Sequence, residues 1–132
     1  AQLKKADQLH DKRRANKRIL ESLFVKYVKG ITIPGELIKA NTSWFGVPII
    51  CESKELKQKL VSFLETKQIQ TRNYFAGNIL LHPAYENLGD FKDFPEANKV
   101  LDLVFFIGTS PAYDANTFEY IETVLKEWEK YE

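Results

Sequence analysis

Residues 44–51 read Trp-Phe-Gly-Val-Pro-Ile-Ile-Cys, and residues 102–108 read Asp-Leu-Val-Phe-Phe-Ile-Gly. Both segments are rich in aromatic and β-branched residues, which favour β-strands. The second segment is apolar at successive positions, so we expect both of its faces to be buried. Pro48 lacks the backbone N–H that a strand donates to its neighbour. The first strand is therefore expected at an edge of the sheet, or bulged at that proline.

The segments around these two strands complete an α+β pattern. A third strand is expected over 69–76, and helices are expected over 54–67 and 115–130. Ser53 and Asp114 stand where N-caps of these helices belong. A short helix is predicted from Pro95 to about residue 101, and residues 79–89 are expected to form a short helix or a loop. Apolar residues recur at helical spacing in the two longer helices: Leu56, Leu60, Val61 and Leu64 in the first, and Phe118, Ile121, Leu125 and Trp128 in the second. We therefore predict a three-stranded sheet with both helices packed on one face.

The first thirty residues are predicted to form one long helix, over 2–29, that ends at Gly30. It has an apolar cluster near each end and a basic stretch between them, made of Lys12, Arg13, Arg14, Lys17 and Arg18. This arrangement is typical of a connector between two bodies, so we divide the chain into a connector helix (1–30) and a small domain (31–132). At least one apolar cluster is expected to stay exposed. The basic stretch is expected to be a solvated face, with contact to nucleic acid or to another domain or subunit as alternatives.

Composition excludes several classes of protein. The 132 residues carry 19 basic and 18 acidic side chains, and this near-neutral balance argues against a nucleic-acid-binding protein. The sequence contains no apolar run of about 20 residues and no apolar leader, so we expect no membrane partner. The single cysteine, Cys51, excludes an intramolecular disulfide and a multi-cysteine zinc site, and it fits a reducing, cytoplasmic environment.

Few residues are candidates for catalysis. The sequence has two histidines, His10 and His82, and it lacks a glycine-rich phosphate loop or ligands at metal-binding spacing. Cys51 and His82 could act as nucleophile and base in a small independent enzyme. However, Cys51 ends an apolar strand, where a free cysteine usually behaves as a small hydrophobic residue. We therefore predict no catalytic, coenzyme-binding or metal-binding residue in this chain.

Residues 71–78 (Thr-Arg-Asn-Tyr-Phe-Ala-Gly-Asn) form the densest polar and aromatic segment. Arg72 offers a guanidinium fork for a carboxylate or a phosphate. Asn78 can both donate and accept hydrogen bonds, which suits a sugar hydroxyl or a backbone group. His82 follows in an irregular segment, and such segments carry binding residues more often than regular elements do. These residues are candidates for ligand binding, with an interdomain salt bridge and an asparagine turn as the structural alternative.

Several of these segments resemble one family. The Ser-Trp-Phe-Gly-Val-Pro of residues 43–48 resembles the Ser-Trp-Phe-Gly-Phe-Pro strand of sugar-nucleotide 3-dehydrases. The Thr-Arg and Gly-Asn of 71–78 and the Pro-Ala-Tyr of 83–85 resemble a segment of the same enzymes. Residues 94–97 and 105–108 resemble their next helix and strand. The resemblance covers most of the chain in the same order, and it identifies the DegT/DnrJ/EryC1/StrS-type family of sugar aminotransferases and dehydrases.

This resemblance implies a small C-terminal domain of a fold-type I enzyme that uses pyridoxal phosphate or pyridoxamine phosphate. The implied partners are an N-terminal coenzyme domain, a nucleotide-sugar substrate in deoxysugar or lipopolysaccharide synthesis, and a second copy in a homodimer. Arg72, Asn78 and His82 would then face the cleft and hold substrate. The coenzyme would bind in the parent enzyme, so the chain alone is expected to be an inactive fragment. Whether the parent is a 3-dehydrase or an aminotransferase stays open.

The alternative from another class is a stand-alone binding module. It would use the basic helix together with four aromatic residues for stacking, Trp44, Phe45, Tyr74 and Phe75. The near-neutral net charge argues against it.

Overall fold

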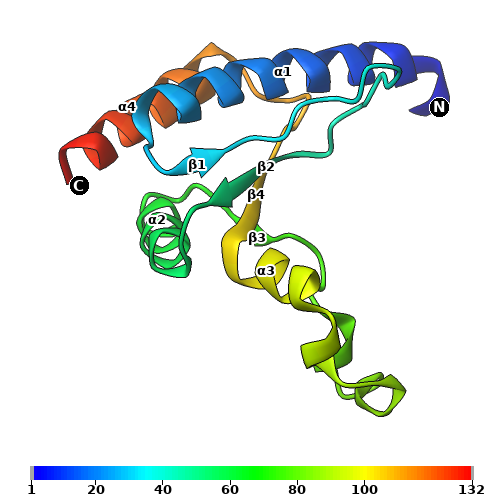
Figure 1. Cartoon of the computed structure of the whole chain (residues 1–132). Helices are drawn as coiled ribbons and strands as arrows, with labels where there is room; N and C mark the ends of the chain where they lie inside the picture. Colours follow the sequence, from blue (N-terminus) through cyan, green and yellow to red (C-terminus); the bar gives the residue numbers. More distant parts are fainter. Residues whose placement is uncertain (1, 132) are drawn as a thin grey trace.

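A small antiparallel sheet with helices on one side is the centre of the computed structural model, which describes residues 2–131 (Figure 1). The strands are β1 (Ile31–Thr32), β2 (Gly46–Cys51), β3 (Arg72–Asn73) and β4 (Val104–Gly108), and they lie in the order β1-β2-β4-β3. The α-helices are α1 (Ala6–Tyr27), α2 (Lys54–Thr66), α3 (Pro95–Leu103) and α4 (Ala115–Tyr131). Short 3₁₀ turns are η1 (Gln2–Lys5), η2 (Ile79–Leu81), η3 (Glu86–Leu88) and η4 (Phe91–Asp93).

The sheet has four strands, so the prediction of three was wrong. The additional strand is β1, which pairs Ile31 with Cys51 and Thr32 with Ile50. Two residues are too few to show the period-two pattern by which a strand is recognised. The edge position predicted for the proline-containing strand was also wrong, because β2 lies between β1 and β4. The register accommodates Pro48 all the same, since β1 ends its pairing at Ile50 and Pro48 pairs with Phe106 of β4 alone.

The strand predicted over 69–76 is much shorter than expected. Only Arg72 and Asn73 pair with β4, opposite Phe106 and Phe105. On either side the chain leaves the extended conformation, because Gln68 and Phe75 both have positive φ values, 59° and 51°. Residues 69–76 do have the composition of a strand, but the backbone turns away from β4 on both sides of the paired residues.

The helices begin where the sequence predicted. Ser53 Oγ accepts a hydrogen bond from the backbone N–H of Leu56 (3.1 Å) and caps α2. Asp114 Oδ1 accepts from the backbone N–H of Thr117 (2.9 Å) at the start of α4. Each bond satisfies a donor that the first helical turn leaves unpaired.

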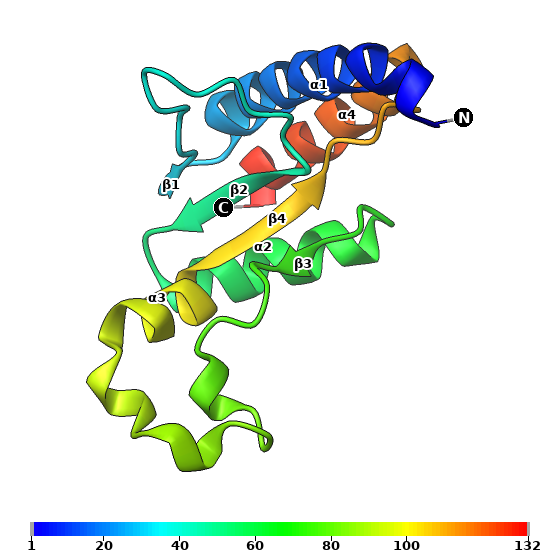
Figure 2. The ribbon, with the colours of Figure 1, turned by 90° about the vertical axis from the view of Figure 1, so that its right-hand side faces the viewer.

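One hydrophobic core joins α1, α2 and α4 to the same face of the sheet. Its fully buried members are Leu20 and Phe24 of α1, Val47 and Ile49 of β2, Phe105 of β4, Leu60 and Leu64 of α2, and Leu125 of α4. The predicted packing of the two longer helices on one face is thus confirmed. Figures 1 and 2 show α1 and α4 running side by side above the sheet.

The long first helix differs along its length. Near its start Leu3 is 90% exposed, whereas Leu20 and Phe24 belong to the core. Of the first apolar cluster only Leu3 is exposed, as predicted, whereas Ala6 and Leu9 are half-buried; most of the second cluster packs within the chain. The division into 1–30 and 31–132 stays a prediction.

The solvated face predicted for the basic stretch was wrong for Lys17, which is only 6% exposed. Its Nζ lies 2.7 Å from Glu21 Oε2 and 4.7 Å from the ring centroid of Trp44. Arg14 donates to the carbonyl of Thr42 (3.3 Å). Arg13 Cζ lies 5.7 Å from the ring centroid of Phe45, so three of the five basic residues contact the segment that precedes β2. Among the described residues, no helix combines the length and apolar character needed to cross a membrane.

Candidate ligand-binding face

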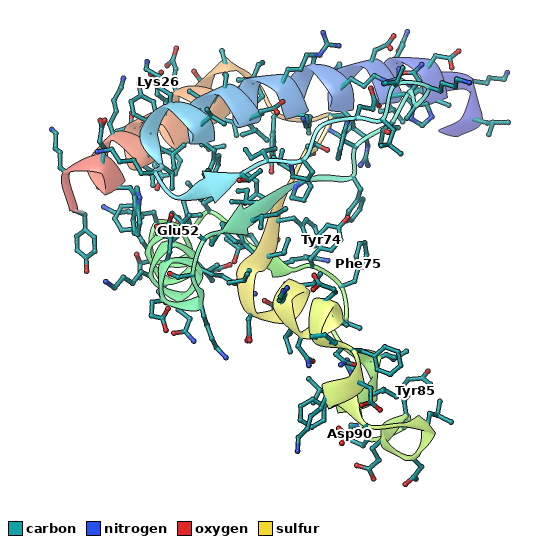
Figure 3. All side chains as sticks on the ribbon, viewed as in Figure 1. Lys26, Glu52, Tyr74, Phe75, Tyr85 and Asp90 are labelled. Atoms are coloured by element: carbon teal, nitrogen blue, oxygen red, sulfur yellow. The ribbon has the colours of Figure 1, made fainter. Side chains whose placement is uncertain are left out.

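The face of the sheet that points away from the helices is covered by aromatic side chains. The register places Pro48, Phe106 and Arg72 side by side on it. The Phe106 ring contacts three others, with centroid distances of 5.8 Å to Phe45, 6.2 Å to Tyr74 and 6.0 Å to Phe75. We call these four rings the open face. Figure 3 shows Tyr74 and Phe75 on the side of the sheet opposite α2.

Of the four rings of the open face, one is buried and three are exposed. Phe106 is 6% exposed, but Phe75 is 72% exposed, and Phe45 and Tyr74 also reach solvent. A contiguous apolar surface of this kind marks an interaction or ligand site more often than a structural one. The face is hollowed by a cavity of about 180 Å³ that all four rings line, together with Trp44.

A larger cleft opens at one end of the open face. Because β3 pairs with β4 only at Arg72 and Asn73, residues 68–71 diverge from the end of β4. The resulting cleft has a volume of about 470 Å³ and lies between this segment, the chain after β4 and the first turns of α4. Arg13 and Arg72 line it, and its lining includes no acidic residue and no lysine. We call it the arginine cleft.

Three interactions fix the walls of the arginine cleft. Asn16 Nδ2, on a buried side chain of α1, donates to the carbonyl of Ser110 (2.6 Å). Thr109 Oγ1 donates to the carbonyl of Trp44, which ties the end of β4 to the chain before β2. Tyr120 of α4 donates from its hydroxyl to the carbonyl of Lys67 (2.8 Å). Hydrogen bonds within the chain therefore hold the walls of the cleft in place.

The two arginines of the cleft have free guanidinium groups. Neither forms an ion pair with any residue from 2 to 131. Arg13 lies with its Cζ 5.7 Å from the ring centroid of Phe45, and Arg72 is exposed on β3. Sequence reasoning singled out Arg72 but not Arg13, because only the fold shows which residue of the basic stretch reaches the cleft.

Asn78 lies apart from the cleft and is 2% exposed. Its Oδ1 accepts from the backbone N–H of Leu80 (3.0 Å), and its Nδ2 donates to the Phe91 carbonyl (3.0 Å) and to Asn98 Oδ1 (2.9 Å). Every polar atom of the side chain is engaged inside the chain. Direct contact with a substrate would require breaking these bonds, so in this structure Asn78 anchors the segment that follows it.

That segment, residues 79–94, projects from the sheet as an arm (Figure 2). The arm contains η2, η3 and η4, where the sequence predicted a short helix or loop. Its apolar side chains are largely exposed, among them Ile79, Leu81, Tyr85, Leu88, Phe91 and Phe94. His82 belongs to the arm, is exposed, and has its Nε2 3.3 Å from the carbonyl of Ala76. Of the three predicted site residues, only Arg72 lines the arginine cleft.

Cys51 and His82 do not form a catalytic pair. Cys51 is buried in the hydrophobic core, and burial raises its pKa to about 11, so the thiol stays protonated at neutral pH. His82 lies in the exposed arm. The part of the chain described, 2–131, also contains no cluster of three metal-ligating side chains.

Two features of residues 2–131 that could hold pyridoxal phosphate, the start of α4 and the buried lysines, are already engaged within the chain. Such a site needs free donors for the phosphate and a lysine that can reach the aldehyde. The start of α4 would be a natural phosphate cradle, but the Asp114 carboxylate already occupies it through Thr117. The two buried lysines are also engaged, Lys17 with Glu21 and Lys57 with the carbonyl of Leu101 (2.6 Å).

Comparison with known proteins gives the family. The sequence profile of the DegT/DnrJ/EryC1/StrS aminotransferase family matches residues 1–126. The chain belongs to this family. Its antiparallel sheet and helices therefore form part of the family's fold. This agrees with the resemblance found in the sequence motifs.

Two curated proteins and one solved structure are similar to this chain. The lipopolysaccharide biosynthesis protein RfbH of Salmonella typhimurium is 27% identical over 97% of this chain and 30% of its own length. The dTDP-4-dehydro-2,6-dideoxy-D-glucose 3-dehydratase of Saccharopolyspora spinosa is 30% identical over 97% of this chain and 28% of its own length. Spr1654 from Streptococcus pneumoniae, solved in its PMP form, has a TM-score of 0.83 at 19% identity, over 98% of this chain and 33% of its own. The chain thus spans about a third or less of these relatives.

Proposed function

We propose that this chain is the C-terminal, substrate-facing part of an enzyme that uses pyridoxal or pyridoxamine phosphate. The enzyme would either remove the C3 hydroxyl of a nucleotide sugar or transfer an amino group to the sugar. Family membership supports the proposal, as do the 3-dehydratase named among its relatives and the relative solved in its PMP form. The observation in this chain that carries it is Arg72, an unpaired arginine at a cleft without acidic residues. The coenzyme would supply the electron sink for the reaction from the part of the enzyme that this chain does not represent.

In this proposal the chain's own residues bind and orient the substrate. Arg72 pairs with negatively charged oxygens of the nucleotide sugar, and exposed His82 offers a hydrogen bond from the arm. Asn78 acts on the same substrate through the arm, whose position it holds by its three hydrogen bonds. No residue of the chain is assigned to bond breaking.

The apolar arm also fits the proposed partners. An exposed set of large apolar side chains on one arm is unusual for a free monomer and is typical of a surface that another body covers. We assign that role to the coenzyme domain of the same enzyme, with a second copy of the enzyme completing a homodimer.

The test uses the complete enzyme that contains this chain, purified with its coenzyme. Incubation with a nucleotide-linked 4-keto-6-deoxy sugar should give a 3-deoxy or an aminated product, detected by mass spectrometry. Arg72→Ala should raise KM about tenfold or more through loss of a charge-assisted hydrogen bond, while the coenzyme absorbance per protein is unchanged. Arg18→Ala, an exposed arginine outside the cleft, is the matched control. Absence of both products would refute the proposed function.

The alternative of a basic binding module is not favoured by the structure. It requires the basic stretch of α1 to be free, yet Lys17 is paired with Glu21 and Arg14 holds the loop before β2. Only part of the predicted basic surface is left for a partner.

A further inference from the structure

The arginine cleft and the cavity of the open face are two parts of one surface. Phe45 and Phe106 line both, so the larger, cationic cleft continues into the smaller, aromatic cavity. One end offers guanidinium groups and the other offers ring faces. A ligand that fills both needs a compact, strongly negative group joined to a flat ring system.

The charge of the cleft is unbalanced within the chain. Arg13 and Arg72 are its only charged lining residues, although the chain as a whole carries a net charge of only +1. The Asp114 carboxylate is directed to Thr117 at the start of α4, with its Oδ1 2.7 Å from Thr117 Oγ1, and it pairs with neither arginine. Two uncompensated guanidinium groups at one cleft favour a ligand with at least two negative charges.

The aromatic end has the chemistry that stacks a base. Phe75 is largely exposed, and its ring stacks on Phe106 with an interplanar angle of 29°. The exposed ring surface beside it costs little to desolvate and accepts any flat π-system. The cleft volume of about 470 Å³ also lies in the range of roughly 300–1,000 Å³ that is usual for small-molecule sites.

We propose that this surface binds the nucleoside diphosphate part of the substrate, with Arg13 and Arg72 on the diphosphate and the base against Phe75 and Phe45. The proposal rests on the proposed function and adds to it a phosphate-binding residue on α1, Arg13, and a location for the base. It also assigns Asn16 as a positioning residue, because its bond to the Ser110 carbonyl holds a residue that lines the cleft.

The test is a titration of the isotopically labelled 132-residue chain, followed by NMR and calorimetry, with three probes: dTDP, thymidine and inorganic pyrophosphate. We expect dTDP to bind most tightly, pyrophosphate more weakly, and thymidine weakest. Backbone amide shifts should appear at Gly108, Thr109 and Ser110, which line the cleft. Binding of dTDP without shifts at these amides, or no binding of dTDP at millimolar concentration, would overturn the proposal.

Variants separate the two ends of the site. Arg13→Ala and Arg72→Ala should each weaken both dTDP and pyrophosphate about tenfold or more. Phe75→Ala should weaken dTDP several-fold and leave pyrophosphate within about twofold. Arg18→Ala, on the same helix as Arg13, should change neither by more than about twofold. An equal effect of Arg13→Ala and Arg18→Ala would show screening by net charge alone and would reject the site.

The outcomes distinguish this inference from the proposed function. If the complete enzyme converts nucleotide sugars but Arg13→Ala leaves both KM and dTDP affinity unchanged, the site is wrong and the proposed function stands. If dTDP binds with the expected variant pattern but the complete enzyme converts no nucleotide sugar, the site stands and the proposed function is wrong.

Discussion

The two faces of the sheet are built from the same strands, yet they are covered in opposite ways. Phe105 points into the core, where three helices bury it completely, whereas Phe106, the next residue, points to the open face. Phe106 is buried only by other rings, and those rings are themselves exposed. One face thus holds the fold together, and the other leaves Phe45, Tyr74 and Phe75 exposed. Residues on the two faces should therefore respond very differently to the same substitution.

The largest expected effect comes from testing that contrast directly. Phe105→Ala should lower the free energy of unfolding by about 3–5 kcal/mol, because it opens a cavity in a helix-covered core. Phe75→Ala should lower it by about 1 kcal/mol or less, because it removes an exposed ring that contacts only neighbouring rings. Urea denaturation followed by circular dichroism measures both changes.

A control keeps this comparison interpretable if Phe105→Ala fails to fold. Phe105→Leu retains most of the buried volume and should cost clearly less than the alanine variant while staying folded. If Phe75→Ala destabilises the chain as much as Phe105→Leu does, the open face is a second core rather than a binding surface.

The core-facing half of the molecule could be predicted from the sequence, because local patterns specify it. Ser53 and Asp114 mark helix starts by their own chemistry, and the apolar spacing of Leu60, Leu64 and Leu125 fixes which side is buried. The DegT/DnrJ/EryC1/StrS motifs also gave the family correctly. These features depend on residues close together in the chain.

The open face and the arginine cleft were harder to predict, because long-range contacts decide their structure. Lys17 is buried beside the Trp44 ring, and Arg13 reaches the cleft only because α1 packs against β2 and bonds to the chain after β4. The third strand was predicted to be too long, because the composition of 69–76 does not reveal the positive φ values of Gln68 and Phe75. Asn78 was predicted to bind substrate, and this stays a prediction; the sequence did not reveal that its amide hydrogen-bonds to the Phe91 carbonyl and to Asn98.

The arm gives a smaller and more local effect. Asn78→Ala removes three hydrogen bonds at a buried position. The Leu80 N–H, the Phe91 carbonyl and Asn98 Oδ1 each lose the bond that this side chain makes. We expect the arm to become less stable by about 1–3 kcal/mol, with a smaller change in global unfolding. Hydrogen exchange should show faster exchange in residues 79–94 and unchanged exchange in β2 and β4.

Asn73→Ala is the matched control for Asn78→Ala, since Asn73 is an exposed asparagine at the edge of the sheet. It should leave exchange in the arm unchanged. If Asn78→Ala accelerates exchange equally in the arm and in the core strands, the arm is not a separate unit, and the contrast between the two halves is weaker than we infer.

The smallest effect concerns the wall of the arginine cleft and depends on pH. Glu65 Oε1 accepts hydrogen bonds from the side chain (2.7 Å) and the backbone N–H of Thr71, which precedes Arg72, and these bonds lower the pKa of Glu65. Because the folded pKa lies below the unfolded one, this stabilisation is present above the unfolded value of about 4.3 and is lost as pH falls through the folded pKa.

The carboxylate is exposed, so solvent screening limits its contribution to less than about 1 kcal/mol. Glu65→Gln should therefore lower stability slightly at pH 7, and this deficit should be smaller at pH 3, because the stabilisation fades as the pH falls toward and through the folded pKa of Glu65. Glu55→Gln, an exposed residue of the same helix, should show no such convergence. Parallel urea titrations at the two pH values measure the difference, and a gap between Glu65→Gln and the unmodified chain that stays constant with pH would mean that the Glu65 charge does not hold the wall of the cleft.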